Sequence, residues 1–158
     1  MTKDSSERRN GELNEAIRYE ETRKAINRLK NGKAAGIDEI VNEIIKYGGE
    51  PVYIVIWQMI KLCFETERIP EEWMKGMIFP IYKSGDERIP ENYRGITLLC
   101  IVEKIYTAIL NERLSIWCEE NDIIAEAQGG FRPGRGCEDQ LFVLVNILRN
   151  RIGKWTHC

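Results

Sequence analysis

A change in sequence period decides the fold. Residues 77–99 read MIFPIYKSGDERIPENYRGITLL. Met77 to Tyr82 is apolar and rich in β-prone residues, and Ile96 to Leu99 is a second such run, so each predicts a β-strand. Ser84-Gly85-Asp86 between them is a turn signal, and Pro90 prevents regular pairing. The stretch therefore predicts a long, irregular β-hairpin.

The sequence on both sides of this hairpin has helical spacing, so we expect an α+β fold that is predominantly helical. The expected helices cover residues 12–29, 38–47, 51–69, 101–117 and 138–152. Asp38 is expected to cap the second helix, and Pro51 to open the third. In the last helix, the residues expected to face inward are Leu141, Leu144, Val145 and Leu148.

The composition is that of an ordinary globular protein. The chain has 158 residues, of which 43% are hydrophobic and 30% charged, enough for one domain with a core. Its longest apolar-leaning stretch, residues 52–64, is too short and too interrupted to span a bilayer. Residues 1–10 lack the apolar run of a secretory signal. We therefore expect an intracellular protein, in the nucleus or cytoplasm, with no membrane partner.

Cysteine, histidine and net charge exclude several kinds of site. The five cysteines are scattered without a C-x-x-C pair, which predicts reduced, mostly buried thiols. His157 is the single histidine and adjoins Cys158, so neither a zinc site nor a His-activated nucleophile is expected. The net charge of -2 argues against a basic surface along the whole chain. Any contact with nucleic acid must come from a local patch.

Two cations flank the turn of the predicted hairpin. Lys83 follows the first strand, and Arg94 opens the facing strand. A lysine point charge beside an arginine fork is a recurrent arrangement for binding polyphosphate. Basic residues at strand ends also commonly meet only solvent or acidic neighbours. The neighbouring acids Asp86, Glu87 and Glu91 leave the salt-bridge alternative open.

A glycine-rich loop, residues 129–136, is the second candidate for ligand contact. Its glycines permit close approach of the main chain to a ligand. Arg132 and Arg135 add positive charge, and a base could stack on Phe131. Such loops also serve simply as connectors. A third glycine-containing loop, residues 32–36, lacks the phosphate-loop pattern and follows no strand, so a phosphate loop is rejected there.

No set of carboxylates in the sequence has the pattern of a two-metal site. The adjacent acids Glu20-Glu21, Glu71-Glu72 and Glu119-Glu120 occupy helix ends or polar helix faces. No segment is typical of a buried strand that bears an aspartate, with a second aspartate pair on a turn. Two-metal phosphoryl transfer needs such convergent carboxylates. We therefore expect no catalytic and no metal-binding residue in this chain.

Taken in order, several segments resemble the conserved blocks of one family. They are NGKAAGID (31–38) with NEII (42–45), IPEEW (69–73) with IFPIYKSGD (78–86), NYRGITLL (92–99) with EKIY (103–106), RL (113–114), and QGGFRPGR (128–135). This series is similar to the reverse transcriptases of non-LTR (LINE-type) retrotransposons. The resemblance covers about residues 20–150.

The resemblance implies a fold and a set of contacts. It implies the fingers of a reverse transcriptase and the start of its palm over residues 12–158, preceded by a flexible tail, residues 1–11. Lys83 and Arg94 match the cations that hold the triphosphate of the incoming dNTP. Gln128, Phe131 and Arg132 match a segment near the template strand, and Lys33 lies in a block near template RNA. The implied partners are an RNA template, a DNA primer and a dNTP.

Some positions depart from the family pattern. Glu39 stands where glycine is common, Gly95 where proline is common, and Cys137-Glu138 replaces a serine or threonine pattern. The strand with the first catalytic aspartate would begin just past Trp155. We therefore expect a palm truncated before the metal site, and a chain inactive alone, although the parent enzyme would use Mg²⁺.

Two alternatives to a polymerase fragment stay open at this point. The chain could be a non-catalytic module that binds nucleic acid, or that binds a protein partner through apolar surface left uncovered by the truncation. It could also be a nonfunctional remnant of a mobile element.

Overall fold

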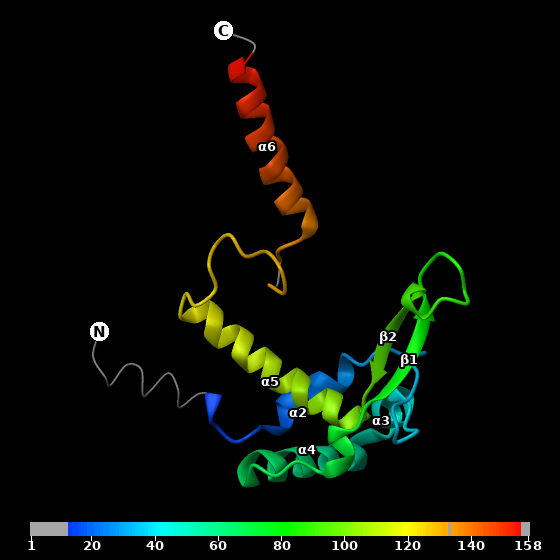
Figure 1. Cartoon of the computed structure of the whole chain (residues 1–158). Helices are drawn as coiled ribbons and strands as arrows, with labels where there is room; N and C mark the ends of the chain where they lie inside the picture. Colours follow the sequence, from blue (N-terminus) through cyan, green and yellow to red (C-terminus); the bar gives the residue numbers. More distant parts are fainter. Residues whose placement is uncertain (1–12, 133, 156–158) are drawn as a thin grey trace. The chain divides into compact units, whose positions relative to one another are not determined.

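The structure is a computed structural model that describes residues 13–132 and 134–155 (Figure 1). The chain divides into two compact units, Met1–Arg113 and Leu114–Cys158, which are described separately. The secondary structure is mostly helical with one two-stranded antiparallel sheet, so the predicted α+β composition is confirmed. The predicted tail, residues 1–11, lies outside the described residues.

Two long helices supply most of the hydrophobic core of the first unit. They are α4 (Gly49–Thr66) and α5 (Ile101–Glu120). Their buried residues are Tyr53, Ile56, Ile60 and Cys63 on α4, and Ile101, Ile105, Tyr106 and Ile109 on α5. Most intervals within each set are three or four residues, which places each set on one side of its helix. The core helix predicted from Pro51 is therefore confirmed, and it ends before Ile69-Pro70, as expected.

The first helix begins later than its apolar spacing predicts. α2 spans Tyr19–Asn27, whereas Ile17 is buried in the non-helical segment before it. The Arg18 N–H donates to the Glu21 carboxylate at 2.8 Å, which fixes the helix start. The Arg113 guanidinium donates to main-chain carbonyl oxygens of residues 13, 15 and 16. Residues 14–18 are not helical, so the prediction of one continuous helix over residues 12–29 is wrong, and Glu12 itself lies outside the described residues.

Asp38 caps a different helix from the one predicted. The short helix α3 (Asn42–Tyr47) has Val41 at its N-cap, because Glu39 turns the chain with a positive φ of 55°. The Asp38 Oδ2 atom instead accepts the main-chain N–H of Ile101 at 2.9 Å, at the start of α5. The loop before Asp38 thus lies against the beginning of α5 and helps to fix it.

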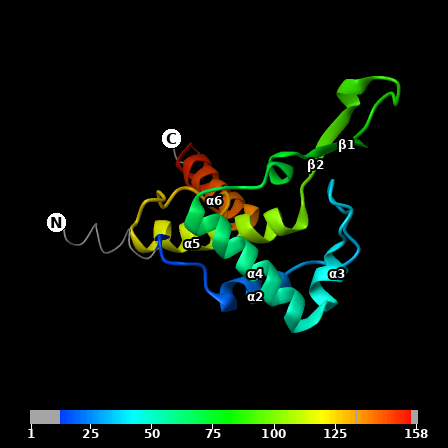
Figure 2. The ribbon, with the colours of Figure 1, turned by 90° about the horizontal axis from the view of Figure 1, so that it is seen from below.

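The predicted hairpin is confirmed. β1 (Met77–Tyr82) has the expected bounds and pairs with β2 (Tyr93–Leu98), which begins earlier than the predicted Ile96. Short 3-10 turns precede each strand, η1 (Glu71–Met74) and η2 (Pro90–Asn92). Pro90 therefore opens a turn, consistent with the predicted irregularity. Figures 1 and 2 show the hairpin projecting away from the helices of the first unit, and most of its residues are exposed.

The second unit contains the end of α5, a connector and α6 (Cys137–Trp155). The helix itself was predicted, but its inward face was predicted wrongly. Leu141, Leu144 and Leu148 are 60%, 53% and 49% exposed, and Val145 is only half-buried. Helical spacing identifies which side chains share a face, and it does not supply a partner element to cover them.

The burial of the cysteine thiols differs from one position to the next. Cys63 and Cys100 are buried free thiols, Cys118 is half-buried and Cys137 is exposed, so the thiols are less uniformly buried than predicted. His157 and Cys158 lie outside the described residues. Over the described ranges, no helix has the length and apolar character needed to cross a membrane.

Candidate functional site

The register of the hairpin places Lys83 and Arg94 on the same face. Arg94 is paired with Ile81, and paired residues of an antiparallel sheet project to the same side. β1 ends at Tyr82, and continuing its alternation by one residue assigns Lys83 to the side of Ile81. The Lys83 N–H donates to the Asn92 carbonyl at 2.9 Å, which supports this continuation. Lys83 and Arg94 are thus diagonal neighbours, a relationship that spaces residues by about 7–8 Å. Both are exposed.

Neither cation is neutralised by the acids of the turn. Within the part of the chain that the structure describes, no ion pair or side-chain hydrogen bond involves Lys83 or Arg94. The Asp86 carboxylate instead accepts the Arg88 N–H at 2.9 Å. The salt-bridge alternative raised by the sequence is therefore not realised here, and both cations are open to an external anion.

Side chains that sequence reasoning did not single out hold the turn in shape. The rings of Tyr82 and Tyr93 meet edge to face with centroids 5.6 Å apart, on the face opposite the cations. Their hydroxyls donate to the carbonyls of Gly85 (2.5 Å) and Glu87 (3.0 Å). Asn92 Nδ2 donates to the Asp86 carbonyl at 2.8 Å. Tyr82 at the end of the first predicted strand was the available signal for this support, whereas Tyr93 lies before the second strand as predicted.

Lys33 lies in the same unit, but its loop contacts the other end of the hairpin. A Cβ at Gly36 would lie only 2.2 Å from the Leu99 carbonyl oxygen, so this loop passes directly against the chain that follows β2. The Gly32 N–H donates to the Glu43 carboxylate at 2.6 Å. Lys33 itself is exposed. The structure therefore does not bring Lys33 to the end of the hairpin that carries Lys83 and Arg94.

The remaining predicted residues belong to the second unit. Arg132 binds Glu119 through both carboxylate oxygens, at 2.8 and 2.6 Å, and donates to the Ala125 carbonyl at 3.1 Å. Its side chain is only 10% exposed. The hydrogen bonds from Arg132 lower the pKa of Glu119 and keep that carboxylate charged. Arg132 is therefore engaged in holding the connector together, as is Arg135 through its ion pair with Glu126.

The two other predicted residues of this loop are accessible. Gln128 is exposed, and its N–H donates to the Ala125 carbonyl at 2.9 Å. Phe131 is fully exposed with a positive φ of 61°, a conformation that is strained for a bulky residue. Its ring stands clear of the Arg132 contacts and presents an open π-face. Phe131 thus remains a stacking candidate.

The described residues do not form a metal site. Across residues 13–132 and 134–155, no three His, Cys, Asp or Glu side chains gather closely enough to hold an ion. A cluster of three carboxylates of the kind that could share Mg²⁺ is therefore not assembled by these residues.

Comparison with known proteins identifies the relatives of this chain. It is 29% identical over 145 residues to the probable RNA-directed DNA polymerase from transposon BS of Drosophila melanogaster, covering 90% of this chain and 16% of that protein. It is 30% identical over 139 residues to the corresponding protein from transposon X-element of the same organism, covering 87% of this chain and 15% of that protein.

A third relative is also an RNA-directed DNA polymerase of a mobile element. The RNA-directed DNA polymerase from mobile element jockey of Drosophila melanogaster is 26% identical over 133 residues, which are 84% of this chain and 14% of that protein. No model of a known protein family matches the chain. The chain spans about one sixth of the length of the curated relatives it matches. It is thus a homologue of a segment of the RNA-directed DNA polymerases of non-LTR retrotransposons, and the resemblance drawn from its motifs is confirmed.

Proposed function

We propose that this chain is part of the fingers of a reverse transcriptase, in which Lys83 and Arg94 bind the triphosphate of an incoming dNTP. One observation carries the proposal: the two cations share a hairpin face, and the described residues give neither of them an anionic partner. A triphosphate offers several charged oxygens to an ammonium group and a guanidinium fork at once. Template RNA, primer DNA and dNTP are the partners that follow from this proposal.

Binding of dTTP to the full chain tests the triphosphate contact. Lys83→Ala and Arg94→Ala are each expected to weaken binding about threefold to tenfold, and added salt should weaken it further. Lys75→Ala and Arg68→Ala are matched controls, because both residues are exposed cations outside the strands. Equal losses in the controls, or no loss in the two hairpin variants, would contradict the proposed triphosphate site.

We further propose that the chain alone does not polymerise DNA. Without convergent carboxylates, the described residues lack the groups that would hold Mg²⁺ against the reacting phosphate. Primer extension with the purified chain, RNA template, labelled dNTP and Mg²⁺ should show no incorporation. Metal-dependent extension by the purified chain would refute this proposal.

A second candidate function, a module that binds a protein partner, is favoured by one observation. Seven large apolar side chains among the described residues of α6 are about half exposed or more: Leu141, Phe142, Val143, Leu144, Ile147, Leu148 and Ile152. An apolar surface of this kind commonly meets another protein. Binding to RNA–DNA hybrid separates the two functions: strongly salt-dependent affinity that is lost in Lys83→Ala and Arg94→Ala favours the polymerase fragment.

A further inference from the structure

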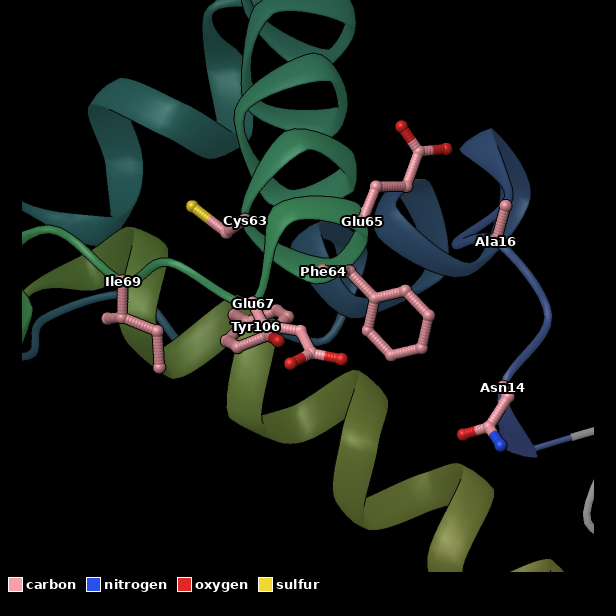
Figure 3. A pocket seen from close by; sticks show the side chains of 8 residues that line it. All are labelled: Asn14, Ala16, Cys63, Phe64, Glu65, Glu67, Ile69 and Tyr106. Carbon is pink, nitrogen blue, oxygen red and sulfur yellow. The ribbon is translucent and has the colours of Figure 1, made fainter.

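A cavity of about 560 Å³ opens in the first unit, away from the hairpin (Figure 3). It lies between the C-terminal end of α4, the segment before α2, and α5. Phe64 and Glu67 come from the end of α4, Asn14 from a turn before α2, and Tyr106 from α5 (Figure 3). The cavity is therefore built by segments that are far apart in the sequence.

The charged groups of this cavity all have one sign. Among the described residues, its lining includes Glu65 and Glu67 and contains no lysine or arginine. Glu65 lies 3.7 Å from the Lys61 ammonium group, whereas Glu67 has no ion pair among residues 13–132 and 134–155. Such a lining repels phosphate and attracts cations. It therefore differs in chemistry from the triphosphate site proposed on the hairpin.

A hydroxyl in the lining, on a buried tyrosine, lacks a protein partner. Tyr106 is 8% exposed, and its hydroxyl makes no hydrogen bond to any residue that the structure describes. The Tyr106 oxygen is not among the buried polar atoms that lack a partner, so it is accessible from the cavity and free to accept a hydrogen bond from a bound molecule. Burial raises the pKa of Tyr106 and that of the Cys63 thiol, which also lines the cavity, so both stay neutral. The two carboxylates then supply the charge of the described lining.

The aromatic ring of Phe64 already takes part in one contact with a cation. The Arg113 guanidinium lies 5.5 Å from the ring centroid, and Glu21 neutralises that guanidinium at 2.7 Å. An aromatic ring attracts cations through its quadrupole, with the strongest effect where water is excluded. Ile69 and Ala16 supply apolar surface beside the ring. The lining thus combines negative charge, an aromatic ring, a hydrogen-bond acceptor and apolar contact.

We propose that this cavity binds an organic cation, a guanidinium or alkylammonium group carried on an apolar stem. Glu67 pairs with the cation, the Tyr106 hydroxyl accepts one of its N–H groups, and the Phe64 ring covers it. Ile69 and Ala16 contact the stem. The site is separate from Lys83 and Arg94, so its test is independent of dNTP binding.

The test uses two matched probes, butylguanidinium and its neutral isostere butylurea, titrated into the ¹⁵N-labelled full chain. Butylguanidinium should shift the amide signals of Phe64, Glu67 and Tyr106 with a dissociation constant of about 1–10 mM. Butylurea should bind at least about fivefold more weakly. Equal binding of the two probes, or shifts confined to other parts of the chain, would overturn the proposal.

Substitutions of single residues test which side chains of the cavity bind butylguanidinium. Glu67→Gln keeps the size of an exposed side chain and should weaken butylguanidinium binding about threefold to fivefold. Tyr106→Phe removes only the hydroxyl and should weaken it about twofold to threefold. Glu87→Gln, in the hairpin turn, is the control and should leave binding unchanged. If Glu67→Gln has no effect, or Glu87→Gln has as large an effect, the proposed site is wrong.

Discussion

The guanidinium of Arg113 holds both carboxylate oxygens of Glu21, with its Nε and Nη2 atoms each 2.7 Å from one oxygen. The same group donates to three main-chain carbonyls of the segment before α2, those of Leu13, Glu15 and Ala16. Its side chain is only 12% exposed. One side chain of α5 therefore ties together α2 and the segment that precedes it.

Replacing Arg113 should destabilise the chain strongly. Arg113→Ala leaves the Glu21 carboxylate and three carbonyls without their donor, and should reduce the free energy of unfolding by about 2–4 kcal/mol. Arg113→Lys should recover only part of this loss, because an ammonium group cannot bind both oxygens in a planar fork. Urea denaturation measures both values. Arg28→Ala removes an exposed ion pair with Glu112 and should cost only about 0–1 kcal/mol. A similar loss in both alanine variants would show that Arg113 has no special role.

The same ion pair predicts a dependence of stability on pH. Hydrogen bonds from Arg113 lower the pKa of Glu21 below its ordinary value of 4.5. A carboxyl whose pKa is lower in the folded state stabilises the fold above its unfolded pKa, and this contribution is lost as the pH falls through the folded pKa. Wild type should therefore be more stable than Glu21→Gln at pH 7, and the difference should shrink as the pH is lowered below 4.5. A difference that stays constant with pH would contradict this linkage.

The features predictable from sequence are those with local signals. The β-prone run of β1 gave its bounds, and Pro51 and Ile69-Pro70 marked the ends of α4 closely. The contacts of Arg113 and the cap from Asp38 to Ile101 join residues far apart in the chain, and no local pattern encodes them. These contacts explain the late start of α2 and the altered role of Asp38.

In the candidate site too, local motifs predicted some features, and others depend on contacts between distant residues. Motifs identified Lys83 and Arg94, but their shared face depends on the pairing of Ile81 with Arg94 across an irregular turn. Neither the turn length nor the spacing of the strands predicts that register. Arg132 was predicted as a contact to template, and only the folded connector reveals that Glu119 occupies it.

Substituting Gly36 should disrupt the packing of the loop against the start of α5. A Cβ at this position would lie 2.2 Å from the Leu99 carbonyl oxygen, which is main chain and cannot move aside easily. Gly36→Ala should therefore lower the free energy of unfolding by about 1–3 kcal/mol. Gly130→Ala is the control, because a Cβ added there would have no described atom within 4 Å and the φ of Gly130 is not positive. Thermal unfolding compares the variants, and equal midpoints would contradict the close approach.

The acceptor atom of Asp38 is expected to matter more than its shape. Asp38→Ala removes the oxygen that accepts the Ile101 N–H and should cost about 0.5–2 kcal/mol, the usual effect of losing an N-cap. Asp38→Asn retains a side-chain oxygen and should lose less than the alanine variant. Hydrogen exchange at the Ile101 amide should become faster in Asp38→Ala. Unchanged protection there would show that this hydrogen bond does not form in solution.

Substituting Phe131 should affect the binding of single-stranded RNA without changing the stability of the fold. Its ring is fully exposed, so Phe131→Ala should change the free energy of unfolding by less than about 0.5 kcal/mol. If a template base stacks on this ring, as proposed for the polymerase fragment, the same variant should weaken binding of single-stranded RNA by about 1–3 kcal/mol. Phe131→Trp keeps an aromatic face and should bind as well as wild type.

Arg132→Lys is expected to affect the folded connector, in contrast to Phe131→Ala, which is expected to leave its stability unchanged. Lysine cannot keep both contacts with Glu119, so this variant should loosen the connector. The measurement is amide exchange at Gln128, whose N–H donates to the Ala125 carbonyl and should exchange faster in the variant.

The outcomes for Phe131→Ala distinguish binding from folding. Loss of RNA affinity in Phe131→Ala without loss of stability would assign the ring to binding. Loss of stability without loss of affinity would assign it to the fold and contradict the stacking contact.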